Sequence, residues 1–207
     1  GVDLDEFRPD DEARARLRAE LDIALDAPVI GMPARWHVDK DHAVLTAAAR
    51  EVLAREPAAR FVLCGADINA GNAELAALLA ATGRPQAFSL LGFRADMARV
   101  LPAFDIGVLA SRTEAFPNVV TETMAAGVPF VATAVGDVPE IIGTTGRIVP
   151  PRDPTALAAA LLELLALPED ARRALGAAAR ARVAEHYALA SSVARYAALY
   201  RELAARH

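Results

Sequence analysis

Short apolar runs alternate with longer amphipathic stretches along most of this 207-residue chain. The runs are continuously apolar, which is typical of strands buried on both faces of a parallel sheet. The stretches between them repeat apolar residues at helical spacing. This pattern predicts six strands, at residues 28–34, 60–65, 87–91, 105–111, 128–133 and 147–149. It predicts helices at residues 41–56, 72–81, 95–103, 117–126, 138–142, 154–166, 168–186 and 189–205.

Strands and helices in this order predict an α/β fold: a doubly wound, six-stranded parallel sheet with helices on both faces and a C-terminal helical tail. Boundary signals agree, since Gly127 follows a helix as a C-cap glycine and Pro154 follows Asp153 at a helix start. No linker, repeat or low-complexity tract divides the chain. We expect a single domain over residues 1–207, made of a lead-in segment and helix (1–27), an α/β core (28–150) and C-terminal helices (151–207).

Polar and glycine residues of interest fall at one edge of the predicted sheet. In doubly wound folds, ligands bind outside the carboxyl ends of the strands. The residues at the carboxyl ends of the first five strands are Arg35 and Lys40, then Gly65, then Gly92 and Arg94, then Glu114, and then Gly136. We therefore expect a ligand site at this edge.

Residues 112–122 are the most informative segment at that edge. Pro117 suits the first helical position, where its missing N–H is not needed, so Glu114 should lie in a loop at a helix mouth and Glu122 inside the helix. A helix mouth favours anions, whereas carboxylates accept hydrogen bonds from sugar hydroxyls. A nucleotide-sugar combines phosphate with hydroxyls and fits both features. Asn118 lies one turn before Glu122 on the same helix face.

Other interpretations of these residues stay open. Glu114 and Glu122 could be the acid and base of a glycoside hydrolase, although such carboxylates flank the scissile bond and these two lie on one side of the cleft. They could also be an exposed loop acid and a helix-surface acid. Arg35 and Lys40 could grip a diphosphate, or flank a solvated turn in which Asp41 caps the next helix. The glycine that follows the fifth strand could allow close approach to a ligand or form an ordinary turn.

Composition narrows the class of protein. The hydrophobic fraction is 54%, yet no apolar run reaches the ~18 residues of a membrane span. The net charge of −5 argues against non-specific nucleic-acid binding. The single Cys64 excludes an internal disulfide and a cysteine-based zinc site, and favours a reducing, cytoplasmic setting. His37 and His42 have no second ligand at metal spacing, so we expect no metal site. Lys40 is the only lysine among 22 Lys and Arg residues.

Several known motifs are missing. The first strand contains Gly31-Met32-Pro33-Ala34 and is followed by no G-x-G-x-x-G, so a dinucleotide-binding function is not supported. A G-x-x-x-x-G-K-[ST] phosphate loop and a Gly-x-Ser-x-Gly elbow are also absent from the sequence. The opening Gly1-Val2-Asp3 has no initiating Met, and we expect the chain to be part of a longer protein.

The ordered set of motifs resembles the carboxy-terminal half of a retaining glycosyltransferase of the GT-B fold, in the glycogen-synthase-like group called family 4. Residues 1–7 resemble the family segment that joins its two Rossmann-like domains. Residues 35–40 resemble its R…K diphosphate loop, and residues 114–122 its E-x7-E motif. Residues 125–129, 136–140, 153–154 and 196–200 also fit, so the resemblance covers nearly the whole chain.

The resemblance implies a catalytic set of Arg35, Lys40 and Glu114. The two cations would neutralise the leaving diphosphate, and Glu114 would hold donor sugar hydroxyls. The implied donor-binding set is Gly31, Arg94, Phe116, Asn118, Val119, Glu122 and Gly136. Within it, Asn118 and Val119 would offer backbone N–H groups, and Glu122 would bind the ribose hydroxyls. The loop near Phe93 and Arg94 would meet the base.

The resemblance also implies hexose transfer with retention from a UDP- or GDP-sugar, with no metal or other cofactor. Two positions depart from the family pattern, because Ala115 and Asp137 stand where glycines are common. Both departures leave the sugar undefined. The alternatives are a non-catalytic nucleotide-sugar-binding or interaction module and, less well supported by E-x7-E, a sugar-nucleotide epimerase.

A further implied partner is a first domain that supplies the acceptor site and the other wall of the cleft. Without it, this chain should bind the donor weakly and transfer nothing. The last predicted helix, with Val193, Tyr196, Tyr200 and Leu203 at helical spacing, would return to that domain or bind a second chain. Any association with a membrane surface would come only through the missing domain, and no nucleic-acid partner is expected.

Overall fold

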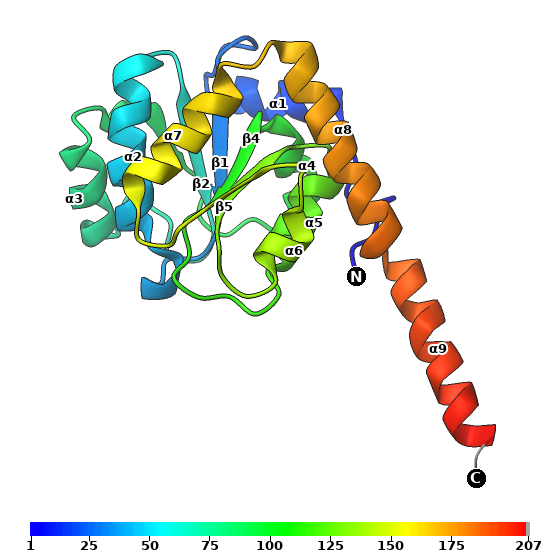
Figure 1. The fold of residues 1–207 in the computed structure, drawn as a ribbon. Coiled ribbons are helices and arrows are strands. Elements are labelled where there is room, and N and C mark those ends of the chain that lie inside the picture. The colour runs from blue at the N-terminus through cyan, green and yellow to red at the C-terminus, as the bar shows by residue number, and fades with distance from the viewer. Residues whose placement is uncertain (206–207) are drawn as a thin grey trace.

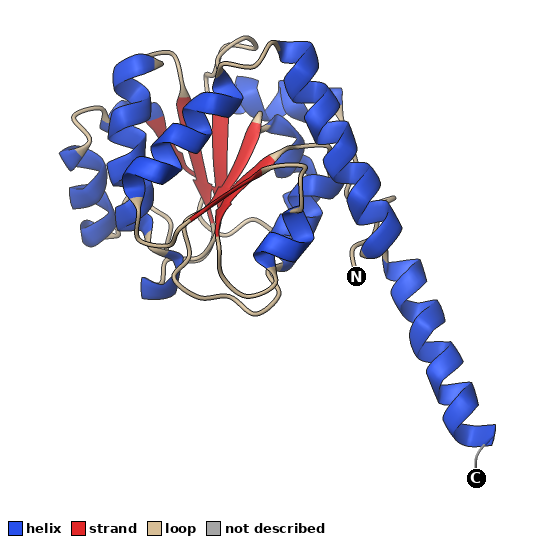
Figure 2. Ribbon diagram, in the orientation of Figure 1, coloured by secondary structure: helices blue, strands red, loops and turns tan. Residues whose placement is uncertain are grey.

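The computed structural model describes residues 1–205 and contains one six-stranded sheet whose neighbouring strands are all parallel. The strand order is β3-β2-β1-β4-β5-β6. The strands are β1 (Val29–Pro33), β2 (Arg60–Cys64), β3 (Phe88–Leu90), β4 (Ile106–Leu109), β5 (Phe130–Thr133) and β6 (Arg147–Val149). Figure 2 shows the strands at the centre with helices on both sides. The predicted doubly wound α/β class is confirmed.

Two layers of helices cover the sheet (Figure 1). The first layer contains α2 (His42–Arg55), α3 (Ala73–Ala81) and α7 (Pro154–Leu165), with α2 and α7 packed side by side. The second contains α1 (Asp11–Glu20), α4 (Met97–Val100), α5 (Asn118–Ala125) and α6 (Val138–Ile142), and α8 (Glu169–His186) packs against α5. The last helix, α9 (Leu189–Ala205), projects beyond the rest of the domain. The sheet is therefore buried on both faces.

Side chains of β2 pack on both faces of the sheet. Phe61 and Leu63 belong to the large apolar cluster that includes α2 and α7. Val62 and Cys64 belong to the smaller cluster that includes α1 and α4. Successive strand residues point to opposite faces, so a strand buried on both faces reads as a continuous apolar run.

The predicted helix over residues 95–103 is wrong in length. Only Met97–Val100 is α-helical, and Leu101–Ala103 forms a 3₁₀ turn, η3. Pro102 lacks the N–H that an α-helical bond would need at that position, so the ladder stops before it. The remaining helices and strands follow the predicted order with small differences at their ends.

Arg18 of α1 holds the amino ends of β1 and β4 together. Its side chain is 1% exposed and donates to the carbonyls of Ala24, Leu25, Ala27 and Ala103 at 2.8–3.2 Å. It also pairs with Asp105 Oδ2 at 2.8 Å, and the same oxygen accepts from the Val29 N–H at 2.7 Å. Burial lowers the pKa of Arg18 from its ordinary value, although Asp105 opposes this effect. This network closes the end of the domain opposite the predicted ligand edge.

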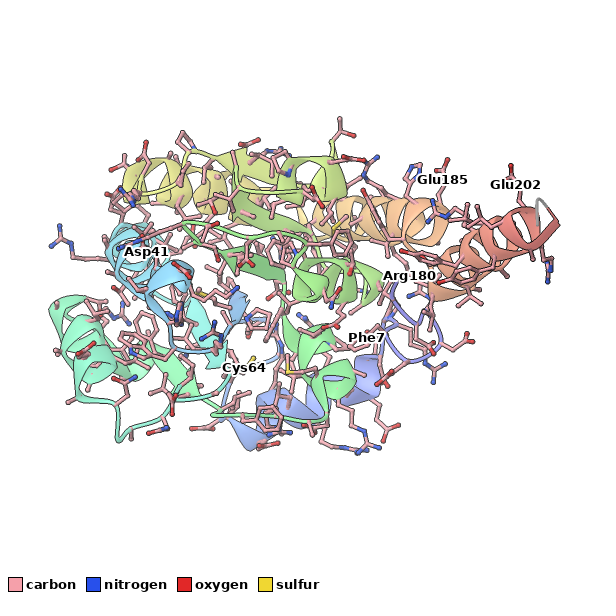
Figure 3. All side chains as sticks on the ribbon, turned by 90° about the horizontal axis from the view of Figure 1, so that it is seen from below. Phe7, Asp41, Cys64, Arg180, Glu185 and Glu202 are labelled. Carbon is pink, nitrogen blue, oxygen red and sulfur yellow. The ribbon has the colours of Figure 1, made fainter. Side chains whose placement is uncertain are left out.

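The first residues of the chain lie against the junction of α8 and α9. Val2 N donates to the Tyr187 carbonyl and the Val2 carbonyl accepts from Leu189 N, both at 2.9 Å. Arg180 of α8 donates to the carbonyls of Leu4 and Phe7 at 3.0 and 2.8 Å (Figure 3). No helix within residues 1–205 is long and apolar enough to span a bilayer.

Candidate functional site

The loops after β1 and β4 meet at the carboxyl edge of the sheet. β1 and β4 are neighbours in space, although β2 and β3 separate them in the sequence. This reversal of strand order is the place where doubly wound folds bind ligands. The loop after β1 passes through the 3₁₀ turn η1 (Val38–Lys40) into α2, and the loop after β4 leads to α5. Figure 3 looks onto this edge.

Lys40 and Glu114 are in contact between these two loops. The Lys40 ammonium donates to Glu114 Oε1, and Ser111 Oγ donates to the same oxygen at 2.7 Å. Thr133 Oγ1, at the end of β5, donates to the Ser111 carbonyl at 2.6 Å. The side chains of Lys40 and Glu114 are only 18% and 11% exposed. Two of the three predicted catalytic residues therefore form an ion pair at the switch point.

Arg35, the third predicted catalytic residue, starts the same loop. Its side chain is exposed and makes no hydrogen bond or ion pair within residues 1–205. The backbone beside it is fixed, because Trp36 N donates to the Ala66 carbonyl at 2.8 Å. Arg35 is thus a free cation on an anchored loop, at the edge where Lys40 and Glu114 meet.

The carboxylate of Asp41 does not cap α2, contrary to the alternative considered from the sequence. Asp41 occupies the N-cap position, but no side-chain capping bond forms. Its carboxylate instead accepts two bonds from the Arg112 guanidinium, at 2.6 and 3.1 Å. Arg112 N also donates to the Asp39 carbonyl at 2.7 Å. These bonds join the loop that contains Lys40 to the loop that contains Glu114.

Gly136 allows a third loop to pack against the loop of Glu114. Its φ is +50°, and a Cβ built there would lie 2.2 Å from the Glu114 carbonyl oxygen and 2.5 Å from that of Ala115. Asp137 N donates to the Ala115 carbonyl at 3.0 Å. Asp137 itself is exposed and, like Asp41, makes no side-chain capping bond at its helix start. A glycine is therefore required at 136 for the position of the Glu114 backbone, whatever ligand binds nearby.

The start of α5 lies one residue later than predicted. Pro117 is the N-cap residue and Asn118 the first helical residue. Because no side chain caps this helix, the N–H groups of Asn118 and Val119 keep the free orientation typical of a first turn. Glu114 lies in the preceding loop and Glu122 inside the helix, as the sequence predicts. The mouth of α5 is consequently next to the Lys40–Glu114 pair.

Glu122 lies half-buried on α5 without a cationic partner in residues 1–205. Burial raises its pKa above the ordinary value, and the negative charge of Glu6 raises it further. Glu6 belongs to the lead-in segment, which Arg180 holds beside the end of α5 through bonds to Phe7 and Ala125. A carboxylate with this environment has unused capacity to accept hydrogen bonds from a ligand.

We expect Glu122→Gln to unfold at a higher temperature than the wild type at pH 7. A raised folded-state pKa means that Glu122 stabilises the fold below its unfolded pKa and that this stability is lost as the pH rises through the folded value. At neutral pH the ionised Glu122 carboxylate lowers the stability of the fold, and the uncharged amide of glutamine removes this effect. Thermal unfolding at pH 4 and pH 7 measures the difference, which should shrink at pH 4. Glu74→Gln, exposed on α3, is the control, and equal shifts for both variants would contradict this account.

Arg94 and Phe116 lie at the borders of this edge. Arg94 is bound by Asp96 at 2.7 and 2.8 Å and by Glu20 of α1 at 3.0 Å, and the hydrogen bond to Asp96 is the main cause of its raised pKa. Its neighbour Phe93 is 76% exposed. Phe116 stacks at a tilt on Tyr187, with ring centroids 5.8 Å apart. The structure thus brings neither side chain into contact with the Lys40–Glu114 pair.

Gly31 does not lie with the other candidates. It is buried in the middle of β1, pairs with Val62 and Gly107, and a Cβ there would lie 2.1 Å from the Phe104 ring. This glycine is needed because the Phe104 ring packs directly on the strand. The interpretation of Gly31 as a donor contact therefore needs correction, since no surface of it reaches the ligand edge.

Comparisons with known proteins show the family of the chain. The model of the family "Glycosyl transferases group 1" matches residues 27–167. The chain is 35% identical to the D-inositol 3-phosphate glycosyltransferase of Corynebacterium jeikeium (strain K411) over 98% of its own length. The chain belongs to the group 1 glycosyltransferase family. It spans about half the length of the relatives it matches, 50% for this one.

Solved structures place this glycosyltransferase domain within the GT-B fold. Sucrose-phosphate synthase from Thermosynechococcus elongatus superposes with a TM-score of 0.88 and 28% identity, over 100% of this chain and 52% of that one. The C-terminal domain of a group 1 glycosyltransferase from Francisella tularensis superposes with a TM-score of 0.79 and 25% identity, over 91% of this chain and 100% of that domain. The predicted GT-B half is confirmed.

Three contacts of the glycosyltransferase domain were not predicted from its sequence. These are the Ser111 bond to Glu114, the Thr133 bond to Ser111 and the Arg112–Asp41 pair. Ser111 and Arg112 adjoin the E-x7-E segment, which is the one signal that could have singled them out. Glu114 lies three positions from Ser111, but Thr133 lies 22 positions from Ser111 and Asp41 lies 71 positions from Arg112, so no local pattern indicates these last two contacts.

The described part of the glycosyltransferase domain contains no cluster of three or more His, Cys, Asp or Glu side chains that could hold a metal. His42 is buried against Trp36, with ring centroids 5.0 Å apart, and burial lowers its pKa to about 4. Cys64 is also buried, which raises the pKa of its thiol to about 12. Both groups are neutral near pH 7 and add no charge to this edge.

Proposed function

We propose that this chain is the donor-binding half of a retaining, metal-independent glycosyltransferase that transfers a hexose from a UDP- or GDP-sugar. The observation that supports this most is the contact between Lys40 and Glu114, 74 positions apart, at the switch point of the sheet and the mouth of α5. A cation and a carboxylate in one place suit a ligand that has both phosphate and hydroxyl groups.

The proposed division of roles follows the position of each group. Arg35 makes no ion pair within residues 1–205 and Lys40 is held by a carboxylate, so both can bind diphosphate oxygens and stabilise the charge that develops as the glycosidic bond breaks. The free N–H groups at the start of α5 favour the same anion. Glu114, released from Lys40, would accept hydrogen bonds from sugar hydroxyls. Glu122, one turn into α5, would accept them from the ribose.

No metal is needed in this proposal, because arginine, lysine and a helix N-terminus supply the positive charge at the diphosphate. Arg94 and Phe116 are the proposed contacts at the two ends of the donor, the base and the sugar respectively. Arg94 would first have to leave Asp96 or share its donors with it. The single, buried Cys64 is compatible with the proposed cytoplasmic setting.

The proposed partner is an upstream domain of the same protein, since relatives are about twice as long as this chain. α9 presents a surface for it. Large apolar side chains recur along this helix at 45–66% exposure: Leu189, Val193, Tyr196, Tyr200 and Leu203. This spacing places them on one helix face, and such a stripe on a projecting helix is typical of an interface. Acceptor binding and transfer are assigned to the complete protein.

A nucleotide titration tests the proposal. We expect UDP or GDP to shift backbone amide NMR signals, or to slow amide exchange, in residues 35–40 and 118–122. Separate titrations with uridine and with inorganic pyrophosphate show which of these amides respond to the nucleoside and which to the diphosphate. The proposal is wrong if no nucleoside diphosphate perturbs either segment.

Two variants test the division of roles within the same titration. Glu122→Ala should weaken UDP and UDP-sugar binding alike, by about tenfold or more, because hydrogen bonds to a charged group contribute roughly 1.5–3 kcal/mol. Glu114→Ala should weaken only the sugar-bearing ligand. If Glu114→Ala weakens UDP and the UDP-sugar equally, Glu114 does not hold the sugar.

A further inference from the structure

Arg112 and Asp41 connect the two loops of the candidate site at the residues next to its charged pair. Asp41 follows Lys40 in the sequence, and Arg112 lies two residues before Glu114. The Arg112 guanidinium donates to both oxygens of the Asp41 carboxylate, which is 2% exposed, at 2.6 and 3.1 Å. Arg112 side-chain atoms make no bond to Lys40 or Glu114. The pair therefore acts on them through the backbone.

Asp41 departs from two local preferences of aspartate, one in its backbone conformation and one in helix capping. Its φ and ψ of 47° and 54° are left-handed, a conformation that disfavours residues other than glycine and, less strongly, Asn and Asp. An aspartate at an N-cap position normally accepts a bond from the helix, but the Asp41 carboxylate accepts from Arg112 instead. A buried carboxylate is tolerated only when it is paired. Local structure alone does not explain such a residue.

The contact fixes the backbone on both sides of the Lys40–Glu114 pair. Lys40 ends the 3₁₀ turn η1, and Asp41 is the residue that follows this turn. On the other loop, Arg112 N donates to the Asp39 carbonyl at 2.7 Å, and Ser111 Oγ donates to Glu114 at 2.7 Å. A lysine side chain has four rotatable carbons and loses entropy when it is ordered. Anchoring its backbone leaves fewer arrangements for the side chain.

We propose that Asp41 and Arg112 are a positioning pair, which holds Lys40 against Glu114 so that both groups are in place before a donor binds. Donor binding would then exchange the Lys40–Glu114 contact for contacts with phosphate and sugar, without moving the loops. The part of this proposal that concerns the donor rests on the proposed function. The part that concerns Lys40 does not.

The lone lysine makes the test direct. Because Lys40 is the only lysine, a chain labelled with ¹³C,¹⁵N-lysine gives one set of side-chain NMR signals. Glu114→Gln, read without ligand, supplies the signal of Lys40 after its partner loses its charge. Asp41→Gly is the main variant, since glycine suits the left-handed backbone and leaves no buried charge behind. Arg112→Gln is the second variant, and it leaves the Asp41 carboxylate buried without its partner.

We expect Asp41→Gly and Arg112→Gln to move the Lys40 signal toward that of Glu114→Gln and to weaken UDP-sugar binding about tenfold, or about 1.4 kcal/mol. Arg147→Gln is the matched control, because it removes an arginine–carboxylate pair with Glu163 that lies away from these loops. This variant should change neither the Lys40 signal nor ligand binding. Folding of each variant is checked by its thermal unfolding.

Two results would overturn the positioning role. One is that the Lys40 signal shifts in Glu114→Gln but stays at the wild-type position in folded Asp41→Gly. The other is a Lys40 signal that Glu114→Gln does not move, because the contact to be positioned would then be missing. If instead UDP fails to bind the wild type while the lysine signals move as expected, the proposed function is wrong and the positioning pair stands.

Discussion

Replacing Gly136 by alanine should displace the loop of Glu114 and weaken UDP-sugar binding by about tenfold or more, the effect of losing roughly 1.4 kcal/mol. The new methyl group would lie 2.2 Å from the Glu114 carbonyl oxygen. This oxygen belongs to the backbone, so no side-chain rotation can relieve the clash. Alanine at φ +50° also destabilises the fold by about 1–2 kcal/mol, because a residue with a Cβ disfavours this left-handed backbone conformation. Crowding of a packed site adds about 1–3 kcal/mol. Calorimetric titration and thermal unfolding measure both effects.

Gly83→Ala is the matched control for this experiment. Gly83 has a φ of +76°, so alanine meets the same kind of backbone penalty, but no atom lies within 4 Å of the added Cβ. We expect Gly83→Ala to lose stability by the left-handed penalty alone and to bind UDP-sugar like the wild type. Equal stability losses for the two variants, with unchanged binding in Gly136→Ala, would show that the close approach at Gly136 is unimportant.

Replacing Arg18 by methionine should destabilise the domain by about 3–5 kcal/mol, the range for breaking a buried ion pair. Four carbonyl groups would lose the Arg18 donor, although that of Ala103 would keep Arg14 and that of Ala24 the Ala27 N–H. Within residues 1–205, Asp105 would keep Arg14 and the Val29 N–H. Methionine restores most of the apolar volume, so the loss reports the polar contacts. For a domain of this size the midpoint of thermal unfolding should fall on the order of 10 °C.

Arg16→Met is the comparison for Arg18→Met. Arg16 lies on the same helix, but its pair with Glu12 is exposed, at 63% and 81% for the two side chains. Exposed pairs contribute about 0–1 kcal/mol, so this variant should unfold close to the wild type. A similar, small loss in Arg18→Met would mean that the carbonyl network contributes little to stability. Nucleotide binding should be unaffected by Arg16→Met.

Much of the fold could be predicted because the strands are buried on both faces. β2 and β4 are almost entirely apolar, and apolar residues in the segments between strands recur at helical spacing. Strands and helices could therefore be told apart from the sequence. The edge position of Lys40 and Glu114 followed from the rule that parallel strands end on one side of the sheet. Pro102 marked the end of α4, but the apolar spacing around it resembled a continuing helix.

Contacts between distant segments could not be predicted in this way. Asp41 had every feature of an N-cap residue, and only the folded chain shows that Arg112 takes its carboxylate. Gly31 was counted among the donor-binding residues, because nothing in the sequence indicates that the Phe104 ring packs on it. The carboxyl group of Glu122 gains its environment partly from Glu6, on a segment far from α5 in the sequence.

The two hydrogen bonds of Val2 have a mechanical consequence. They join the first residues of the chain to the break between α8 and α9, so a rotation at this break would move α9 relative to the sheet. At 1.5 Å per residue, α9 is about 25 Å long, and a 10° turn at the break would sweep its tip through about 4 Å. A small rotation at the isolated bridge between Val2 and Ala188 would thereby become a larger displacement of the apolar stripe.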